Sequence, residues 1–516
     1  MRCLRFSSVF LLAALCSSGQ DLKEFEKKVT EFTLPNGLHF IVLERHEIPI
    51  VSFHTFVNAG SVDDPAGETG TARLLGRMAY KGSETIGTLS APAEKKALDA
   101  IEEAYDRVEA EMNKGIKADQ SRIDMLRNQA RIAGDAAKHT YQSNEYVRIL
   151  DENGATNRIA TASLDSTSFA YSLPANRAEL WFLLESQRLI HPVFRDFYQE
   201  RDAQFEQYQQ QLTVNPQVKL FAEFVATAFK THPYRVPPDG WPGDIQHLRR
   251  SAARDFFERY YVPGNTTISI VGDANPADFK RMAERYFGPM AARPMPPRPP
   301  SDELPQEGPK TVVLESSGPT LLAVGYKRPD WYDKDDLCFD LMQFLFSQGG
   351  SGMLSRDLVQ EKRLALQVRA GATFPSGRFP NLMVFFLVPA QGRTVEENVR
   401  GLEDLLQRFK SVLIDPQNLA RAKAQLRSTF LRRITTNDDM AKLLATYHAN
   451  YGDWRKMFTS MDELSKVTAD SVQRAAEKYL VATGRTVAYT VAPGQSNLPP
   501  APPKPQPVDR KTGGVN

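Results

Sequence analysis

The pattern of apolar and polar positions changes period along the chain. Residues 38–44 (LHFIVLE) and 50–57 (IVSFHTFV) are rich in β-branched and aromatic residues, which is typical of buried strands. The stretch GTARLLGRMAYKGS, residues 70–83, follows them with apolar residues at helical spacing. These patterns predict two strands followed by a short helix that begins after a glycine-containing turn.

This short helix carries an unexpected pair of charges. Leu74, Leu75 and Met78 are spaced to point inward, so Arg73 and Arg77 share a neighbouring face one turn apart. Two like charges at this spacing repel by a few tenths of a kcal/mol. Local helix stability therefore does not explain the two arginines.

A second helical pattern follows, over about residues 92–142. Apolar residues recur at intervals of three and four, with one break at 113–115. This predicts a helical hairpin inserted in the domain, with a narrow apolar seam and charged outer faces. We interpret it as a decoration of the domain edge, and a partner-docking surface is the alternative. The seam consists of Leu98, Ile101, Tyr105, Val108, Met112, Ile123, Leu126 and Ala130.

Proline clusters divide the chain. Residues 289–309 are too rich in proline for a helix or a central strand, which predicts a stiff linker between domains at 28–288 and 310–494. The proline-rich residues 495–516 predict a disordered tail.

The two halves share a segment. ERYYVPGNTTISI (258–270) and EKYLVATGRTVAY (477–489) align without gaps, and each has the pattern of a helix end, a turn and a strand. The shared offset of 219 residues favours a duplicated domain, although one matched segment is also consistent with a common packing unit. We expect an α+β fold of two similar domains.

Composition and the N-terminus bear on location. With 516 residues, 41% of them apolar, the chain can form more than one core. Residues 1–19 combine early arginines, a short apolar run and small residues, which predicts a signal peptide. No later segment has the roughly 20 apolar residues that a membrane helix needs. We therefore expect an exported protein, periplasmic or secreted, that is soluble and has no stable membrane insertion.

Cysteine content and charge exclude several classes. A lipid anchor at Cys16 is disfavoured because Leu15 is bulkier than the residue that lipoprotein processing prefers. Loss of the signal leaves Cys338 as the only thiol, so no intrachain disulfide forms, and its apolar surroundings predict a buried structural role. The exported chain is also formally neutral, which gives no indication of nucleic-acid binding.

The sequence contains no local catalytic motif. None of the eight histidines forms an i, i+4 pair of the kind that binds zinc, and the serine elbow G-x-S-x-G is absent. His39 and His54 lie in strand patterns, so we expect packed or surface side chains rather than ligands. The glycine-containing segment 347–356 lacks the lysine of a phosphate cradle.

Several segments, in order, resemble the insulinase or pitrilysin family of zinc peptidases, which includes the mitochondrial processing peptidase and its two-domain bacterial relatives. The resemblance implies two homologous domains that form a clamshell. It covers about residues 31–493 and rests on segments 34–65, 163–188, 200–207, 260–273 and 349–365.

The residues that the family uses for chemistry are replaced. The resemblance places residues 70–83 at the family's inverted zinc motif, H-x-x-E-H. Arg73 and Arg77 stand at the two histidine positions, Gly76 at the general base, and Gln207 at the third ligand, a glutamate. A guanidinium stays charged and offers no lone pair, so two of them repel zinc. We expect no zinc cofactor and no hydrolysis by the family's mechanism.

The positions that contact peptide in the family are altered as well. By the same resemblance, Ile159 occupies the place of an asparagine in the substrate-pairing strand. Gln360 and Gln367 occupy the places of an arginine and a tyrosine that hold the scissile region. These three are candidate peptide-contact positions. We further hypothesise that Arg73 and Arg77 pair with a carboxylate such as Glu206.

Three functions compete. The first is a noncatalytic, peptide-binding or structural subunit that partners a zinc-competent homologous chain, since the family often works as such pairs. The second is a standalone peptide-binding or chaperone-like protein that holds extended segments by β-augmentation. The third is a metalloendopeptidase with a relocated site, for which Glu200, Glu206 and His232 are the candidates.

Overall fold

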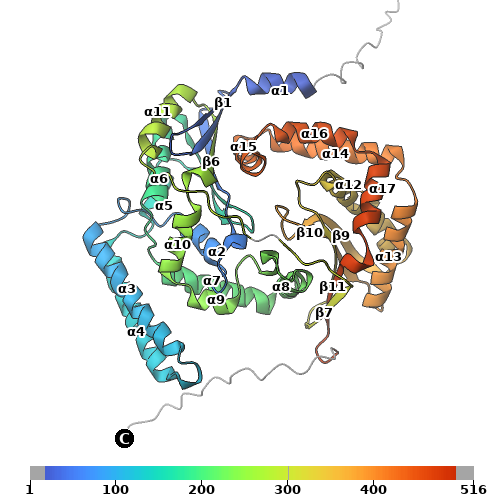
Figure 1. Cartoon of the computed structure of the whole chain (residues 1–516), viewed down its shortest axis with the longest axis horizontal. Coiled ribbons are helices and arrows are strands. Elements are labelled where there is room, and N and C mark those ends of the chain that lie inside the picture. The colour runs from blue at the N-terminus through green and yellow to red at the C-terminus, as the bar shows by residue number, and fades with distance from the viewer. Residues whose placement is uncertain (1–17, 300–301, 496–516) are drawn as a thin grey trace, which may run out of the picture.

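The computed structural model describes residues 18–299 and 302–495. Two β-sheets, each flanked by helices, face each other across the molecule (Figure 1). The predicted signal peptide of residues 1–19, including Cys16, and the predicted tail of residues 495–516 fall almost wholly outside the described residues.

The first sheet has six strands in the order β1-β2-β6-β3-β5-β4. β2 and β6 are parallel, and the other neighbours are antiparallel. The predicted strands at 38–44 and 50–57 are confirmed as β2 and β3. The strands are β1 (Val29–Thr33), β2 (His39–Glu44), β3 (Ile50–Val57), β4 (Thr156–Ala162), β5 (Thr167–Pro174) and β6 (Thr266–Gly272).

The first half of the chain contains the following α-helices. They are α1 (Ser18–Glu26), α2 (Thr71–Arg77), α3 (Ala91–Met112), α4 (Gln120–Ala137), α5 (Glu145–Glu152), α6 (Ala178–Ile190), α7 (Phe197–Val214), α8 (Pro216–Ala228), α9 (Pro242–His247), α10 (Arg250–Tyr260) and α11 (Pro276–Phe287).

The second sheet has five strands in the order β7-β11-β8-β10-β9. The strands are β7 (Lys310–Glu315), β8 (Leu322–Arg328), β9 (Ala365–Phe374), β10 (Asn381–Pro389) and β11 (Arg485–Val491). The helices are α12 (Asp336–Ser347), α13 (Val395–Ser411), α14 (Pro416–Arg433), α15 (Asn437–Tyr451), α16 (Lys456–Lys466) and α17 (Ala469–Tyr479), with a π-helical turn, η8 (Ser355–Glu361). Cys338 on α12 is a free, buried thiol, as predicted.

The two halves repeat one topology. β11 pairs in parallel with β7 and antiparallel with β8, as β6 pairs with β2 and β3. The matched segments 258–270 and 477–489 form the same helix, turn and strand in each half, namely α10 with β6 and α17 with β11. The α+β fold of two similar units predicted from the sequence is therefore confirmed.

Each half contributes one helix to the other half's sheet. α15 of the second half packs against β3 and β6, and α8 of the first half packs against β7 and β11. Two apolar clusters result, one joining Ile41 and Val271 to Leu444, the other joining Phe224 to Ala323 and Ala488. The halves are thus held together by buried apolar surface at two places.

The helical extension is formed by α3 and α4, which project from the body (Figure 1). The seam predicted from the sequence is present, since Leu98, Val108 and Ile123 are buried.

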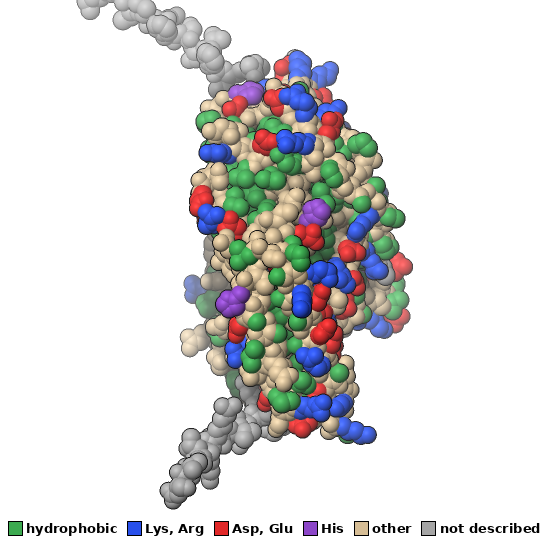
Figure 2. Space-filling view, turned by 90° about the vertical axis from the view of Figure 1, so that its left-hand side faces the viewer, with side chains coloured by type: hydrophobic (Ala, Val, Ile, Leu, Met, Phe, Trp, Pro, Cys, Tyr) green, Lys and Arg blue, Asp and Glu red, His purple; other side chains and the backbone are tan. Residues whose placement is uncertain are grey.

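On the face in Figure 2, acidic and basic side chains are interspersed. Among the described residues, the longest helices are too polar to be candidates for crossing a bilayer.

The predicted linker is fixed to the body at Glu303. Its carboxylate accepts hydrogen bonds from the backbone N–H groups of Lys230 at 2.7 Å, Thr231 at 2.9 Å and His232 at 3.0 Å. Lys327 on β8 lies 3.5 Å away. Burial alone would raise the pKa of Glu303, but the backbone donors and Lys327 outweigh it and lower the pKa to about 2.

This lowered pKa gives a pH-dependent contribution to stability. Because the folded pKa lies below the unfolded value, the contribution is present above about pH 4.5 and is lost as the pH falls towards 2. We expect Glu303→Gln to lower the free energy of unfolding at pH 7 by about 2 kcal/mol and the difference to shrink on acidification. Urea unfolding between pH 7 and 3 measures this, with the exposed neighbour Glu307→Gln as control. A constant difference at all pH values would contradict the assignment.

Candidate functional site

The site predicted from the sequence is built on α2. Gly70 precedes the helix with φ 99°, and a Cβ there would lie 2.7 Å from the Asp239 carbonyl oxygen, so only glycine fits. Asp64 accepts hydrogen bonds from the N–H groups of Gly70 at 2.8 Å and Ala72 at 2.9 Å, which fixes the start of the helix. The predicted inward face is confirmed: Leu74, Leu75 and Met78 are buried.

Arg77 faces α7. Its guanidinium lies 3.1 Å from the Glu200 carboxylate and donates to the side-chain oxygen of Gln207 at 3.0 Å. Lys81 lies 2.8 Å from the other Glu200 oxygen. The structure therefore brings Arg77 and Gln207 together, with Glu200 balancing two cations.

Arg73 lies one turn earlier and faces a different acid. Its Nε is 3.3 Å from the Asp239 carboxylate, and it donates to the Ala162 carbonyl of β4 at 3.3 Å. The hypothesis that Glu206 pairs with the arginines is wrong. Glu206 lines a cavity on the other side of α7, whereas Glu200 and Gln207 face α2.

Gly76 is buried against β4. A Cβ at this position would lie 3.1 Å from the Ala162 backbone nitrogen and 3.5 Å from the Ala162 Cβ. The first contact is tighter than ordinary packing and the second is an ordinary van der Waals contact, so the absence of a side chain lets α2 and β4 approach closely. A side chain at position 76 would therefore require β4 to shift by a few tenths of an ångström.

The zinc of the resembled family does not fit these residues. Both guanidinia donate hydrogen bonds and offer no lone pair, and Gln207 already accepts one from Arg77. Metal ligands must supply lone pairs, and a dication between two arginines is repelled. The donor set at α2 and α7 is therefore that of an ion-pair network.

β4 is an edge strand of the first sheet, and most of its residues are exposed. Ile159 is 41% exposed. The Tyr80 hydroxyl donates to the Ile159 carbonyl at 2.8 Å, and Arg73 bonds to Ala162 as described. This edge lies directly beside the replaced motif.

Gln360 and Gln367 lie in the second half. Gln360, on η8, donates to the Gly350 carbonyl at 2.9 Å, and Gln367 is on β9, the edge of the second sheet, opposite Val388. Among the described residues no hydrogen bond joins either side chain to α2 or β4.

A cavity of about 890 Å³ lies between α7 and the α3–α4 hairpin. Apolar seam residues such as Ile101 and Val108 line it together with Arg201 and Glu206. It opens on the face of α7 opposite to Arg77, so the cavity and the replaced motif are separate features.

A relocated site is not assembled either. His232 is 1% exposed, its Nδ1 accepts from the Tyr234 N–H, and its ring packs against Phe379. Glu200 is in the ion pairs with Arg77 and Lys81. Among the described residues, the one grouping of three histidine, cysteine or carboxylate side chains close enough to share a metal is elsewhere, at Glu31, His39 and His448.

Comparison with known proteins agrees with this fold. A sequence profile described as "Peptidase M16 inactive domain" matches residues 247–426. "Zinc protease PqqE" of Helicobacter pylori is 24% identical over 355 residues, 67% of this chain and 79% of that protein. An "Uncharacterized zinc protease" of Rickettsia felis is 20% identical over 460 residues, 86% of this chain and 93% of that protein.

Solved structures match over most of the chain. A protease from Helicobacter pylori superposes with TM-score 0.74 at 20% identity, covering 90% of this chain and 99% of that one. A peptidase M16 inactive domain from Pseudomonas fluorescens gives TM-score 0.70 at 17% identity, covering 90% and 98%. The periplasmic protease PqqL of Escherichia coli gives 0.65 at 13% identity, covering 90% of this chain and 48% of that one.

The fold and the sequence matches define the class: an α+β protein built from two metallopeptidase-like units. The chain is a homologue of the insulinase-type, or M16, metallopeptidases, as the resemblance predicted. The profile match begins at residue 247, after α2 and α7, so it does not bear on the replaced motif.

Proposed function

We propose that this chain is an exported, noncatalytic M16 homologue that binds extended peptide segments as a subunit beside a zinc-competent relative. The observation that carries this proposal is the state of α2: two guanidinia are held by Asp239 and Glu200, and Gly76 is packed against β4. Water activation needs a bound metal or a general base. The side chains at α2 do not fit a metal, and Gly76 carries no carboxylate to act as a base. The periplasmic location named for the PqqL match supports export.

Peptide binding is supported by the exposed edge of β4. An extended segment can add to a free strand edge through backbone hydrogen bonds, and pockets for alternate side chains give selectivity. Tyr80 and Arg73 now bond to the carbonyls of Ile159 and Ala162, and an added strand would replace these contacts. The same edge favours the standalone peptide-binding alternative, so the partner must be tested separately.

The catalytic part of the proposal predicts no chelator-sensitive peptide cleavage by the purified chain. Restoring the ligands with Arg73→His, Arg77→His and Gln207→Glu together should add one bound zinc per chain, because Arg77 and Gln207 are already in contact. Metal analysis after dialysis compares this variant with the natural chain in parallel. Cleavage by the natural chain that is lost on chelation and restored by zinc would overturn the proposal.

The binding part is tested by calorimetry with an unfolded peptide of roughly ten residues, the length of a long strand. Ile159→Lys should weaken binding at least threefold by placing a charge at the edge, whereas the exposed Leu183→Ala on α6 should not. Co-purification of a zinc-competent homologue from the native host supports the subunit role. Peptide binding by the isolated chain without such a partner favours the standalone alternative.

A further inference from the structure

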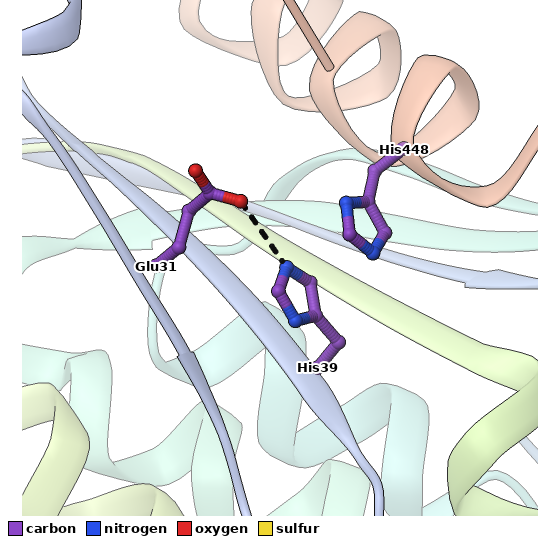
Figure 3. Close-up of side chains that lie close together, drawn as sticks. All are labelled: Glu31, His39 and His448. Carbon is purple, nitrogen blue, oxygen red and sulfur yellow. Dashed lines mark ion pairs between the residues drawn. The ribbon is translucent and has the colours of Figure 1, made fainter. Parts of the chain in front are cut away.

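Three side chains converge where the second half packs on the first sheet (Figure 3). Glu31 comes from β1, His39 from β2 and His448 from the last turn of α15. One potential ligand atom of each lies within 4.8 Å of those of the other two. These residues are separate from the α2 and α7 positions discussed above.

The strand pairing explains why Glu31 and His39 meet. Glu31 is opposite Ile41 and Thr33 is opposite His39, so all four residues lie on one face of the hairpin. Ile41 on this face belongs to the apolar cluster that α15 covers. The packing of α15 therefore delivers His448 to a carboxylate and an imidazole that are already adjacent.

Two nitrogen atoms in this group make no hydrogen bond. Nε2 of His39 and Nδ1 of His448 are buried without a hydrogen bond. Nδ1 of His39 is 2.9 Å from the Thr33 hydroxyl. If His39 donates from Nδ1, its Nε2 presents a lone pair to the Glu31 carboxylate, 3.5 Å away. In that tautomer two acceptors face each other, and a cation between them would satisfy both.

We propose that Glu31, His39 and His448 bind a divalent transition-metal ion, best suited to Zn²⁺, that fastens α15 to the β1–β2 edge. Two imidazoles and one carboxylate are borderline ligands typical of zinc, and water would complete a four-coordinate site. Metal–ligand bonds of about 2.1 Å in a tetrahedron place neighbouring ligands ~3.4 Å apart, close to the separation between Glu31 and His39.

The surroundings supply charge balance and orientation. The second Glu31 oxygen accepts from Arg455 at 3.0 Å, and Arg455 also pairs with Glu26 and Asp453. Three carboxylates and one guanidinium leave the region negative before any metal binds.

Binding requires one local rearrangement. The rings of His39 and His448 are stacked, with centroids 3.8 Å apart and planes 3° from parallel. An imidazole lone pair lies in the ring plane, so two parallel rings cannot both point at one ion, and His448 must turn about its side-chain bonds. Loss of ring stacking is thus an expected signature of the bound state.

The test uses the purified chain, dialysed against chelator and titrated with ZnCl₂ by calorimetry. We expect one equivalent of Zn²⁺ to bind. His39→Gln and His448→Gln should each weaken binding at least tenfold, because loss of a residue that merely supports a metal ligand already weakens binding about tenfold or more. Thr33→Val should weaken it by up to tenfold by removing the orienting hydrogen bond. His139→Gln, on the exposed turn after α4, should leave it unchanged.

Two results would overturn the proposal: no binding of Zn²⁺ by the natural chain, or equal binding by the natural chain and both histidine variants. Co²⁺ bound to the natural chain gives a reading that needs no variant, because a paramagnetic ion shifts the imidazole resonances of its ligands. Shifted signals from His39 and His448 support the site, and unshifted ones refute it. Slower hydrogen exchange in α15 with Zn²⁺ would show that the ion joins the two halves.

Discussion

Arg195→Met should lower the free energy of unfolding by about 3–5 kcal/mol, the cost of removing one partner of a buried ion pair. Arg195 is 1% exposed and forms a two-pronged pair with Glu94, which is 3% exposed. It also donates to the carbonyl oxygens of Lys81, Ser83 and Ile86 at 2.7–2.9 Å. The methionine variant leaves a buried carboxylate and three carbonyls without this donor.

The effect should reach the candidate site, because Lys81 both receives a hydrogen bond from Arg195 and pairs with Glu200. Urea unfolding measures the loss, and hydrogen exchange of residues 78–88 measures the loosening. The matched control is Arg131→Met, where a 67% exposed side chain pairs with Asp135 and a change below about 0.5 kcal/mol is expected. Equal losses in both variants would contradict the role assigned to Arg195.

Phe224→Ala should lower the free energy of unfolding by about 3–5 kcal/mol and loosen the contact between the halves. The ring is fully buried in the cluster that joins α8 to the second sheet. It sits over Gly325 of β8, where a Cβ would lie 2.7 Å from the ring. This fit between a glycine and a ring leaves a cavity when the ring is removed.

A graded series separates packing from nonspecific effects. Phe224→Leu should cost less than Phe224→Ala because it leaves a smaller cavity. Leu366→Ala, at a 62% exposed position on β9, should change stability by less than about 0.5 kcal/mol. Limited proteolysis measures how firmly the halves are held together. Faster cleavage between the halves is expected for Phe224→Ala and not for the control Leu366→Ala. Unchanged proteolysis would mean that α8 does not hold the halves together.

The sequence predicted local structure well where one period was sustained. The runs of β-branched and aromatic residues indicated β2 and β3, the helical seam indicated α3 and α4, and a single repeated segment indicated the duplicated fold. The short helix was predicted from its glycine and its inward leucines. These features depend on neighbours in the chain, so their physical causes are visible in the sequence itself.

Predictions that needed a particular neighbour succeeded less often. The sequence suggests that the two arginines pair with carboxylates and offers Glu206 as an example, whereas Arg77 pairs with Glu200. Both acids are on α7, and only the rotation of that helix against α2 decides which one faces the arginines. Asp239 carried no signal, because it lies in a loop far along the chain from Arg73.

The sequence by itself determined the elements and the duplication, and through the resemblance it predicts that the residues of the family's zinc chemistry are replaced. Tertiary structure alone decided which acids pair with the arginines and that β4 packs closely against Gly76. It also decided that α8 and α15 each pack on the sheet of the other half. It also brought His448 to His39, more than 400 residues earlier in the chain. Such contacts arise because burying apolar faces fixes the relative position of whole elements, which local patterns do not encode.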